Sequence, residues 1–210
     1  MIMFISSIDE ILTEFKKGHF VIMVDNQHRE NEGDLMIAAE FANAEKINFM
    51  LKEARGMICL AITAKQASQL ELPFMKPTQN MVGRNHAAFT YSIEASHGVT
   101  TGISARERAH TIQTAINPSA KAGDLVCPGH VFPIVAQDGG VLVREGHTEA
   151  SVDLANLAGL NPSALICEIL NDEGDAANNA NLMVFSEKYK IKIGSVDDLI
   201  SFRKNMKSVQ

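Results

Sequence analysis

The sequence predicts an α+β fold in which one mixed β-sheet is covered by helices in a layered α/β/α arrangement. Short apolar runs typical of strands are scattered along the whole chain and alternate with segments of helical periodicity. The 210 residues contain no internal repeat, no low-complexity stretch and no clear linker. We therefore expect a single domain over residues 1–210, a length that also allows two smaller ones.

The first half of the chain begins with a helix. A capping box at Ser7–Glu10 precedes apolar residues at helical spacing as far as Phe15, and Gly18 ends the helix. The next predicted elements are strand Phe20–Val24, strand Leu35–Ala39, helix Asn43–Ala54 and strand Met57–Ile62. A second capping box, Thr63–Gln66, starts another helix. The segment Glu71–His86 has little periodicity and is expected to be a long loop.

The second half continues the alternation of strands and helices. The predicted elements are strand Ala88–Ala95, the hydroxyl-rich turn Gly98–Gly102, a helix capped by Ser104 and running to about Ile116, helix Thr148–Gly159, strand Ala164–Leu170, and two C-terminal helices flanking a short strand near Ile191–Ile193. Between them, Val131–Val135 and Val141–Val143 flank Gln137–Gly140 in a pattern that predicts a β-hairpin.

Composition excludes some classes of protein. A net charge of -6 argues against broad nucleic-acid binding, so an anionic substrate would need a local cationic pocket. No apolar stretch approaches the roughly 20 residues of a membrane span, and the apolar start lacks the basic flank of a secretory signal. Cys59, Cys127 and Cys167 are too far apart for a CxxC metal site and odd in number. We expect a cytoplasmic protein with Cys59 and Cys167 in the core.

The segment Asp25–Asp34, between two predicted strands, is unusually rich in charge. Arg29, Glu30, Glu32 and Asp34 lie within six positions, whereas a strand-connecting turn needs only a few Gly, Asn or Asp residues. Carboxylates concentrated at the end of a sheet suit a hard divalent cation and a polar substrate. The alternative is a solvated charged loop.

A second segment, Arg144–Glu149, lies where a strand is expected to end and a helix to begin. Gly146 relaxes the backbone there, and Thr148 is a candidate N-cap. A helix start attracts phosphate through its N–H groups, Arg144 can add a bidentate clamp, and His147 can bind a metal. The alternative is a capped helix with a solvent-exposed Arg144 and a hydrogen-bonded His147.

Two further residues stand in settings that suit chemistry. His130 lies between Pro128 and Pro133, which would hold its imidazole in a fixed direction. The alternative is a turn in which His130 binds a carbonyl. Glu168 lies within an apolar strand, where a carboxylate is costly unless it is paired or faces a pocket at the strand end. The alternative is an outward-facing glutamate on an edge strand.

Together these segments resemble the 3,4-dihydroxy-2-butanone 4-phosphate synthases of riboflavin biosynthesis. The matching segments, in the order found in the family, are Arg29–Asp34, Gly98–Ala105, Pro128–Pro133, Gly139–Leu142, Arg144–Glu149 and Cys167–Glu168. Each match is weak alone, but the ordered set is specific and covers about residues 6–203. No second domain is apparent, so the resemblance is to the monofunctional form without a fused GTP cyclohydrolase.

The resemblance implies a lyase that converts D-ribulose 5-phosphate into L-3,4-dihydroxy-2-butanone 4-phosphate and formate. It implies Mg2+ or Mn2+ held by Glu30 and His147, no organic cofactor, and a homodimer with a shared active site. His130 and Glu168 would be the catalytic pair. The substrate-binding residues that it implies are Arg29, Glu30, Asp34, Arg144, Glu145, Gly146, His147, Thr148 and Glu168. The residue types agree with this chemistry, because a divalent ion can polarise the ketose carbonyl and stabilise an enediolate.

The chain also departs from the family pattern. Asn26, Gln27 and His28 stand where the family is usually more acidic, Asn171–Asn178 lacks the usual Arg, and Tyr189 or a neighbour replaces a family His. Three hypotheses follow: an active synthase, an enzyme acting on another ketose phosphate, and a catalytically weakened paralogue that binds sugar phosphate.

Overall fold

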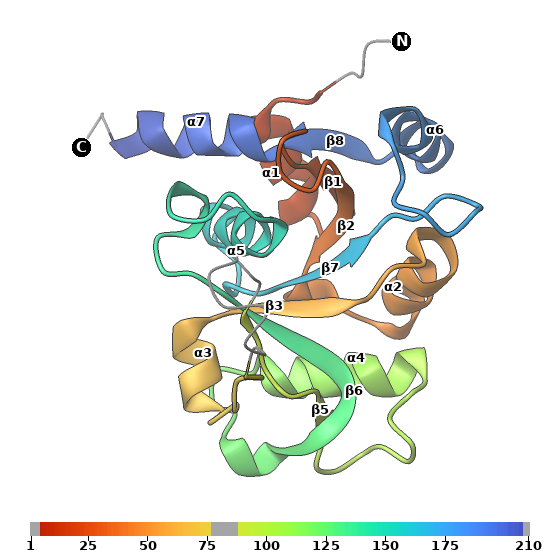
Figure 1. Ribbon diagram of the computed structural model, residues 1–210. Helices are drawn as coiled ribbons and strands as arrows, with labels where there is room; N and C mark the ends of the chain where they lie inside the picture. The colour runs from red at the N-terminus through yellow and green to blue at the C-terminus, as the bar shows by residue number, and fades with distance from the viewer. Residues whose placement is uncertain (1–4, 77–87, 208–210) are drawn as a thin grey trace.

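The computed structural model describes residues 5–76 and 88–207 (Figure 1). Its sheet has the strand order β4-β6-β3-β7-β2-β1-β8, and β5 pairs with β6 outside this path. The strands are β1 (Val21–Val24), β2 (Gly33–Ala38), β3 (Cys59–Thr63), β4 (Ala88–Phe89), β5 (Ile93–Ala95), β6 (Leu125–Ala136), β7 (Ala164–Glu168) and β8 (Lys192–Ser195). The α-helices are α1 (Ile8–Lys16), α2 (Ala44–Phe49), α3 (Ala64–Gln69), α4 (Ala105–Ala115), α5 (His147–Leu157), α6 (Asn179–Tyr189) and α7 (Val196–Lys207).

Helices cover both faces of the sheet, as the α/β/α prediction requires. Residues of α1, α5 and α7 pack on one face, with Ile11, Phe15 and Leu199 completely buried. Residues of α2, α4 and α6 pack on the other face, where Ile47 is completely buried and Leu182 nearly so. Figure 1 shows α5 and α7 on one side of the strands and α2 and α6 on the other. The two cores confirm the predicted α+β fold.

Strand directions bring several chain segments to one end of the sheet. β1 and β2 are antiparallel and meet at Val24 and Gly33, so the loop between them lies at this end. β7 runs antiparallel to β2 and places Glu168 directly opposite Asp34. β8 runs parallel to β1, with Ser195 beside Val24. The same end of the sheet therefore carries the charged loop, the end of β7 and the start of α7.

Most predicted helix starts are confirmed by their caps. The Ser7 hydroxyl accepts the N–H of Glu10, the Thr63 hydroxyl accepts that of Gln66, and Ser104 caps α4. The helix predicted over Asn43–Ala54 begins as expected, and then widens into a π-helical turn at Met50–Ala54. The predicted strand Ala88–Ala95 is divided into β4 and β5. Residues 77–86 of the predicted long loop lie outside the described residues.

The predicted hairpin around Gln137–Gly140 is wrong. After β6 the chain forms a short 3-10 helix at Gly140–Leu142 instead of a returning strand. Gly139 and Gly140 both have positive φ, 96° and 63°, which turns the chain away from the sheet. The Val141 N–H then donates to the Asp153 carboxylate of α5 at 2.9 Å. The backbone N–H of Val141 is therefore bonded to a side chain twelve residues further along the chain, and not to the carbonyl of a neighbouring strand.

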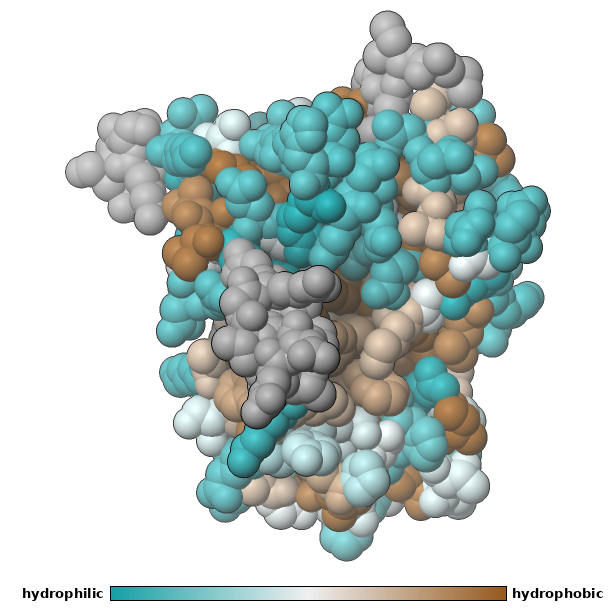
Figure 2. Space-filling model, in the orientation of Figure 1, coloured by the Kyte–Doolittle hydropathy of each residue, from teal (hydrophilic) through white to brown (hydrophobic). Residues whose placement is uncertain are grey.

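The cysteines and the surface agree with the composition. All three cysteines are free thiols, with Cys59 and Cys167 buried as predicted and Cys127 exposed. Among the described residues, no helix is long and apolar enough to cross a membrane. Figure 2 shows hydrophilic residues predominating over α1 and β8 in this view, with neutral and hydrophobic residues more frequent over β3 and β6.

Candidate active site

The loop after β1 is folded around Asp25, which was not among the site residues predicted from the sequence. Its side chain is completely buried and accepts the Arg29 guanidinium at 2.8 Å. It also accepts the N–H groups of Glu30 at 3.1 Å and Glu32 at 2.9 Å. These bonds fix the direction of the following acidic side chains. The loop is therefore an ordered structure and not a solvated connection.

Glu30 and His147 meet, although they come from distant parts of the chain. Ligand atoms of Asp25, Glu30 and His147 all lie within 4.8 Å of one another. The His147 Nδ1 lies 3.7 Å from the Glu30 carboxylate and 3.6 Å from that of Asp34. The predicted pair of metal-binding side chains is therefore assembled within one chain, with Asp25 as a third candidate.

The electrostatics of this group come from burial and from crowded carboxylates. Burial raises the pKa of Asp34 to about 7, against the opposing effect of the His147 ring. Burial on its own would lower the pKa of His147, but Asp34, Glu30 and Asp25 reverse this and raise it to about 9. The His147 ring and then Arg29 lower the pKa of Glu30 to about 2. Several carboxyl groups thus surround one imidazole ring.

These residues fit a divalent cation. The His147 Nε2 and the Asp34 Oδ1 are buried, and among the described residues neither has a hydrogen-bond partner. Unsatisfied buried polar atoms are costly unless another group binds them. Carboxylate oxygens with an imidazole nitrogen form a donor set that Mg2+ or Mn2+ accepts. Glu30 and His147 would hold the ion, with Asp25 and Asp34 beside them.

A cavity of about 750 Å3 opens beside Asp25, Glu30 and His147, the candidate metal-binding group. It gathers several of the residues selected from the sequence for substrate binding. Its lining residues are Asn26, His28, Arg29, Glu30, Val143, Arg144 and Glu145. Two arginines and two glutamates face one space, so the cavity offers guanidinium groups to an anion but does not carry the net positive charge expected of a cationic pocket.

Arg144 and the start of α5 differ in detail from the prediction. Arg144 is 6% exposed and pairs with the buried Glu149 at 2.6 Å, so the alternative of a solvent-exposed arginine is wrong. The N-cap of α5 is Gly146 and not Thr148, which lies buried in the first turn. A Cβ at Gly146 would lie 2.2 Å from the Arg144 guanidinium. Because Gly146 has no side chain, the Arg144 guanidinium can lie against its backbone. His147 follows as the first residue of the helix.

Glu168 is the last residue of β7, a central strand of the sheet, so the edge-strand alternative is wrong. β7 lies between β3 and β2, and Glu168 is half-buried opposite Asp34. Its carboxylate accepts the Met57 N–H at 2.8 Å. Directly opposite residues of antiparallel strands have side chains on the same face of the sheet. Glu168 therefore lies next to the metal-binding group.

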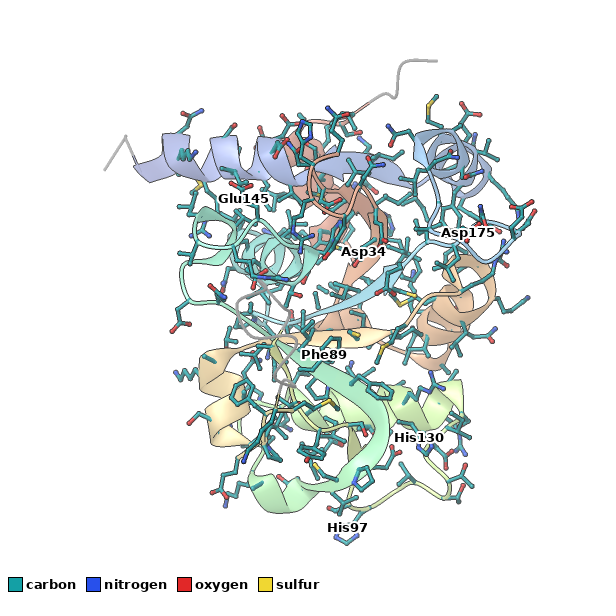
Figure 3. The ribbon with its side chains drawn as sticks, viewed as in Figure 1. Asp34, Phe89, His97, His130, Glu145 and Asp175 are labelled. Carbon is teal, nitrogen blue, oxygen red and sulfur yellow. The ribbon has the colours of Figure 1, made fainter. Side chains whose placement is uncertain are left out.

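His130 lies apart from these residues. It belongs to β6 and not to a turn, and β3 and β7 separate that strand from β2. Its Nδ1 lies 2.8 Å from the Glu94 carboxylate, which also accepts the His130 N–H and the Thr111 hydroxyl. Figure 3 shows His130 and Asp34 in different parts of the molecule. Strand β3 lies between His130 on β6 and Glu168 on β7, and among the described residues no hydrogen bond or ion pair joins the two side chains.

Comparison with known proteins identifies the family. The family model for 3,4-dihydroxy-2-butanone 4-phosphate synthase matches residues 9–202. The chain belongs to the 3,4-dihydroxy-2-butanone 4-phosphate synthase family. A synthase from Neisseria meningitidis serogroup A is 54% identical over 98% of this chain and 56% of its own length. One from Vibrio cholerae serotype O1 is 42% identical over 95% of this chain and 90% of its own.

Solved structures of the family have the same fold. A two-domain 3,4-dihydroxy-2-butanone 4-phosphate synthase from A. baumannii is 48% identical, with a TM-score of 0.90 over 94% of this chain and 58% of its own. A synthase in complex with two magnesium ions is 36% identical, with a TM-score of 0.87 over 96% of this chain and 98% of its own. The chain spans about half the length of several relatives that it matches, 56% for the meningococcal synthase.

The departures from the synthase pattern have structural roles. The Asn26 side-chain oxygen accepts the His28 N–H at 2.9 Å, and both residues line the cavity. Asn171 stabilises its own loop by accepting the N–H groups of Glu173 and Asp175. The Tyr189 hydroxyl donates to the Glu53 carboxylate. The altered positions are therefore integrated into the fold.

Proposed function

We propose that this chain converts D-ribulose 5-phosphate into L-3,4-dihydroxy-2-butanone 4-phosphate and formate. The observation that carries the proposal is the meeting of Asp25, Glu30 and His147 beside a cavity lined by Arg29 and Arg144, in a chain of this family. An enzyme acting on another ketose phosphate, or a paralogue that binds sugar phosphate without turnover, would use the same cavity. An assay must therefore separate these two hypotheses from the active synthase.

The cation that fits Glu30 and His147 is proposed to be Mg2+ or Mn2+. The relative with two bound magnesium ions supports Mg2+. When bound, such an ion supplies polarisation of the ketose carbonyl, which makes the adjacent proton easier to remove. No organic cofactor is needed for this chemistry, and none is proposed.

The side chains divide the remaining work between binding and proton transfer. Arg29 and Arg144 bind the anionic end of the substrate, which orients the reacting carbons. Glu145, Gly146 and Thr148 complete that end of the site. Glu168, held by the Met57 N–H, lies where it can exchange protons with substrate near the metal-binding group.

A homodimer would complete the site. His130 is bonded to Glu94 and has no contact with Glu168 of its own chain among the described residues, so we propose that a second copy supplies it. The His130 side chain is 43% exposed. Large hydrophobic side chains from the neighbouring segments are exposed as well, including Tyr91 (50%), Ile103 (49%) and Val126 (49%). Such side chains are typical of a surface that is covered by another subunit.

The proposed environment is the cytoplasm. Three free cysteines, one of them exposed, suit a reducing compartment. The proposed partners are the sugar phosphate, the cation and a second copy of the chain, with no nucleic acid and no membrane among them. The net charge of -6 is consistent with this set.

The deciding experiment is formate release from ribulose 5-phosphate. We expect about one formate per substrate with Mg2+ present, loss of release with EDTA, and recovery when excess Mg2+ is restored. Glu168→Gln should abolish release, whereas the matched change Glu187→Gln, at an exposed position on α6, should not. Tight binding without formate would indicate a weakened paralogue. Formate from another ketose phosphate alone would indicate a different substrate.

A further inference from the structure

The C-terminal helix α7 begins beside the charged loop because of the strand register. β1 and β8 are parallel, with Val24 next to Ser195. The chain leaves β1 into the charged loop and leaves β8 into α7, so these two segments start side by side. The Asn26 side chain donates to the Asp197 carboxylate in the first turn of α7 at 2.9 Å. One end of α7 is thus bonded to the loop that carries Glu30.

Further along, α7 is bonded to the turn and helix that carry His147, the second candidate metal ligand. Arg203 lies six residues after Asp197, which is about 9 Å along a helix. Its guanidinium donates to the Gly139 carbonyl at 2.8 Å and to the Asp153 carboxylate at 2.5 Å. Asp153 belongs to α5, the helix whose first residue is His147, and it also accepts the Val141 N–H. The two partners are only 21% and 8% exposed, so this contact is largely shielded from water.

The backbone at Gly140 is adapted to this contact. A Cβ there would lie 2.2 Å from the Asp153 carboxylate and 2.4 Å from the Arg203 guanidinium. Gly140 also has a φ of 63°, which side chains rarely tolerate. The close approach of Arg203 therefore depends on a glycine in the same turn that leads to Arg144 and His147.

We infer that α7 is a brace that holds the two halves of the metal-binding group in position, with Asp197 and Arg203 as its positioning residues. Neither residue is among the candidate ligands. Asp197 restrains the loop of Glu30, and Arg203 restrains the turn and helix of His147. The inference rests on the proposed function for the identity of the substrate, while the brace itself is defined by the contacts of α7.

The test compares matched variants in the full chain. Asp197→Ala removes the contact with Asn26, and Asp198→Ala removes the neighbouring exposed carboxylate as a control. Arg203→Met keeps the aliphatic stem but removes the charge, and Arg203→Lys is the conservative variant. The readouts are the Mn2+ dissociation constant without substrate, amide hydrogen exchange over residues 26–32 and 139–147, and kcat and KM for formate release.

We expect Asp197→Ala and Arg203→Met to raise the Mn2+ dissociation constant by about three- to tenfold, less than the ~10–100-fold seen when groups bonded directly to metal ligands are removed. Exchange should become faster in residues 26–32 for Asp197→Ala and in residues 139–147 for Arg203→Met. KM should rise while kcat stays within about twofold, because the chemical groups remain. Arg203→Lys should lie between wild type and Arg203→Met.

Two results would overturn the inference. One is wild-type Mn2+ affinity and exchange in Asp197→Ala, which stays decisive even if Arg203→Met does not fold. The other is an equal effect of Asp198→Ala, which would indicate a general charge effect at the helix start. Failure of the proposed function is distinguishable: the wild type would then release no formate, while the Mn2+ and exchange differences would still decide the role of α7.

Discussion

Gly56 sets the position of Glu168, and replacing it with alanine should impair turnover more than folding. The Gly56 N–H donates to the Glu168 carbonyl at 3.2 Å, and the next N–H, of Met57, donates to its carboxylate at 2.8 Å. A methyl group at Gly56 would lie 2.4 Å from that carbonyl oxygen and 2.7 Å from the carboxylate oxygen. Contacts this short force the strand or the side chain to move.

The size of the effect follows from the overlap. Overpacking of this kind costs about 1–3 kcal/mol of folding free energy. A displacement of about 1 Å at a reacting group can lower the rate by about 100-fold. We therefore expect Gly56→Ala to remain folded and to lose about 100-fold in kcat. Formate release measures the rate, and urea unfolding measures the stability.

The control is another glycine. A Cβ at Gly123 would have no atom within 4 Å, so Gly123→Ala should keep wild-type kcat and change stability by no more than about 0.5 kcal/mol. A folded Gly56→Ala with wild-type kcat would refute the reasoning. Glu168→Asp gives an independent check, because it withdraws the carboxylate from the Met57 N–H without adding a methyl group.

Three further predictions concern stability. Arg144→Ala should destabilise the fold by about 3–5 kcal/mol in urea, since it leaves the buried Glu149 without this cation, and a loss below about 1 kcal/mol would contradict that. Hydrogen bonds from Thr100 lower the pKa of Glu107 to about 2. Glu107→Gln should therefore be less stable than the wild type above about pH 5, and this difference should disappear as the pH falls to about 2. Melting temperatures across that range measure the difference. Phe15→Ala, at a completely buried site, should cost about 3–5 kcal/mol, and a smaller loss in urea would show that the α1 core repacks.

Much of the fold could be predicted because its signals are local. The caps at Ser7, Thr63 and Ser104 depend on residues three positions apart, and each is present. The candidate site could be predicted in part for the same reason, since Glu30 and His147 lie in short segments of unusual composition. Their meeting needed the resemblance to a family, because no local pattern gives the strand order.

What could not be predicted depends on distant partners. Gly139–Gly140 suits a hairpin turn equally well, and only the contact between Val141 and Asp153 decides against it. Asp25 was predicted only as the first residue of the charged segment, and its importance comes from the folded loop that surrounds it. The placement of His130 on β6, with β3 between it and Glu168 on β7, depends on the strand order, which the spacing of residues does not reveal.

The position of β8 in the sheet has a consequence for synthesis on the ribosome. β1 is the first strand of the sheet to be made, but its outer neighbour, residues 192–195, is the last. Strand β1 must therefore wait with one edge unpaired until all the other strands of the sheet have emerged. Nascent chains arrested before that point should fail to capture the cation, even though every ligand has already been translated.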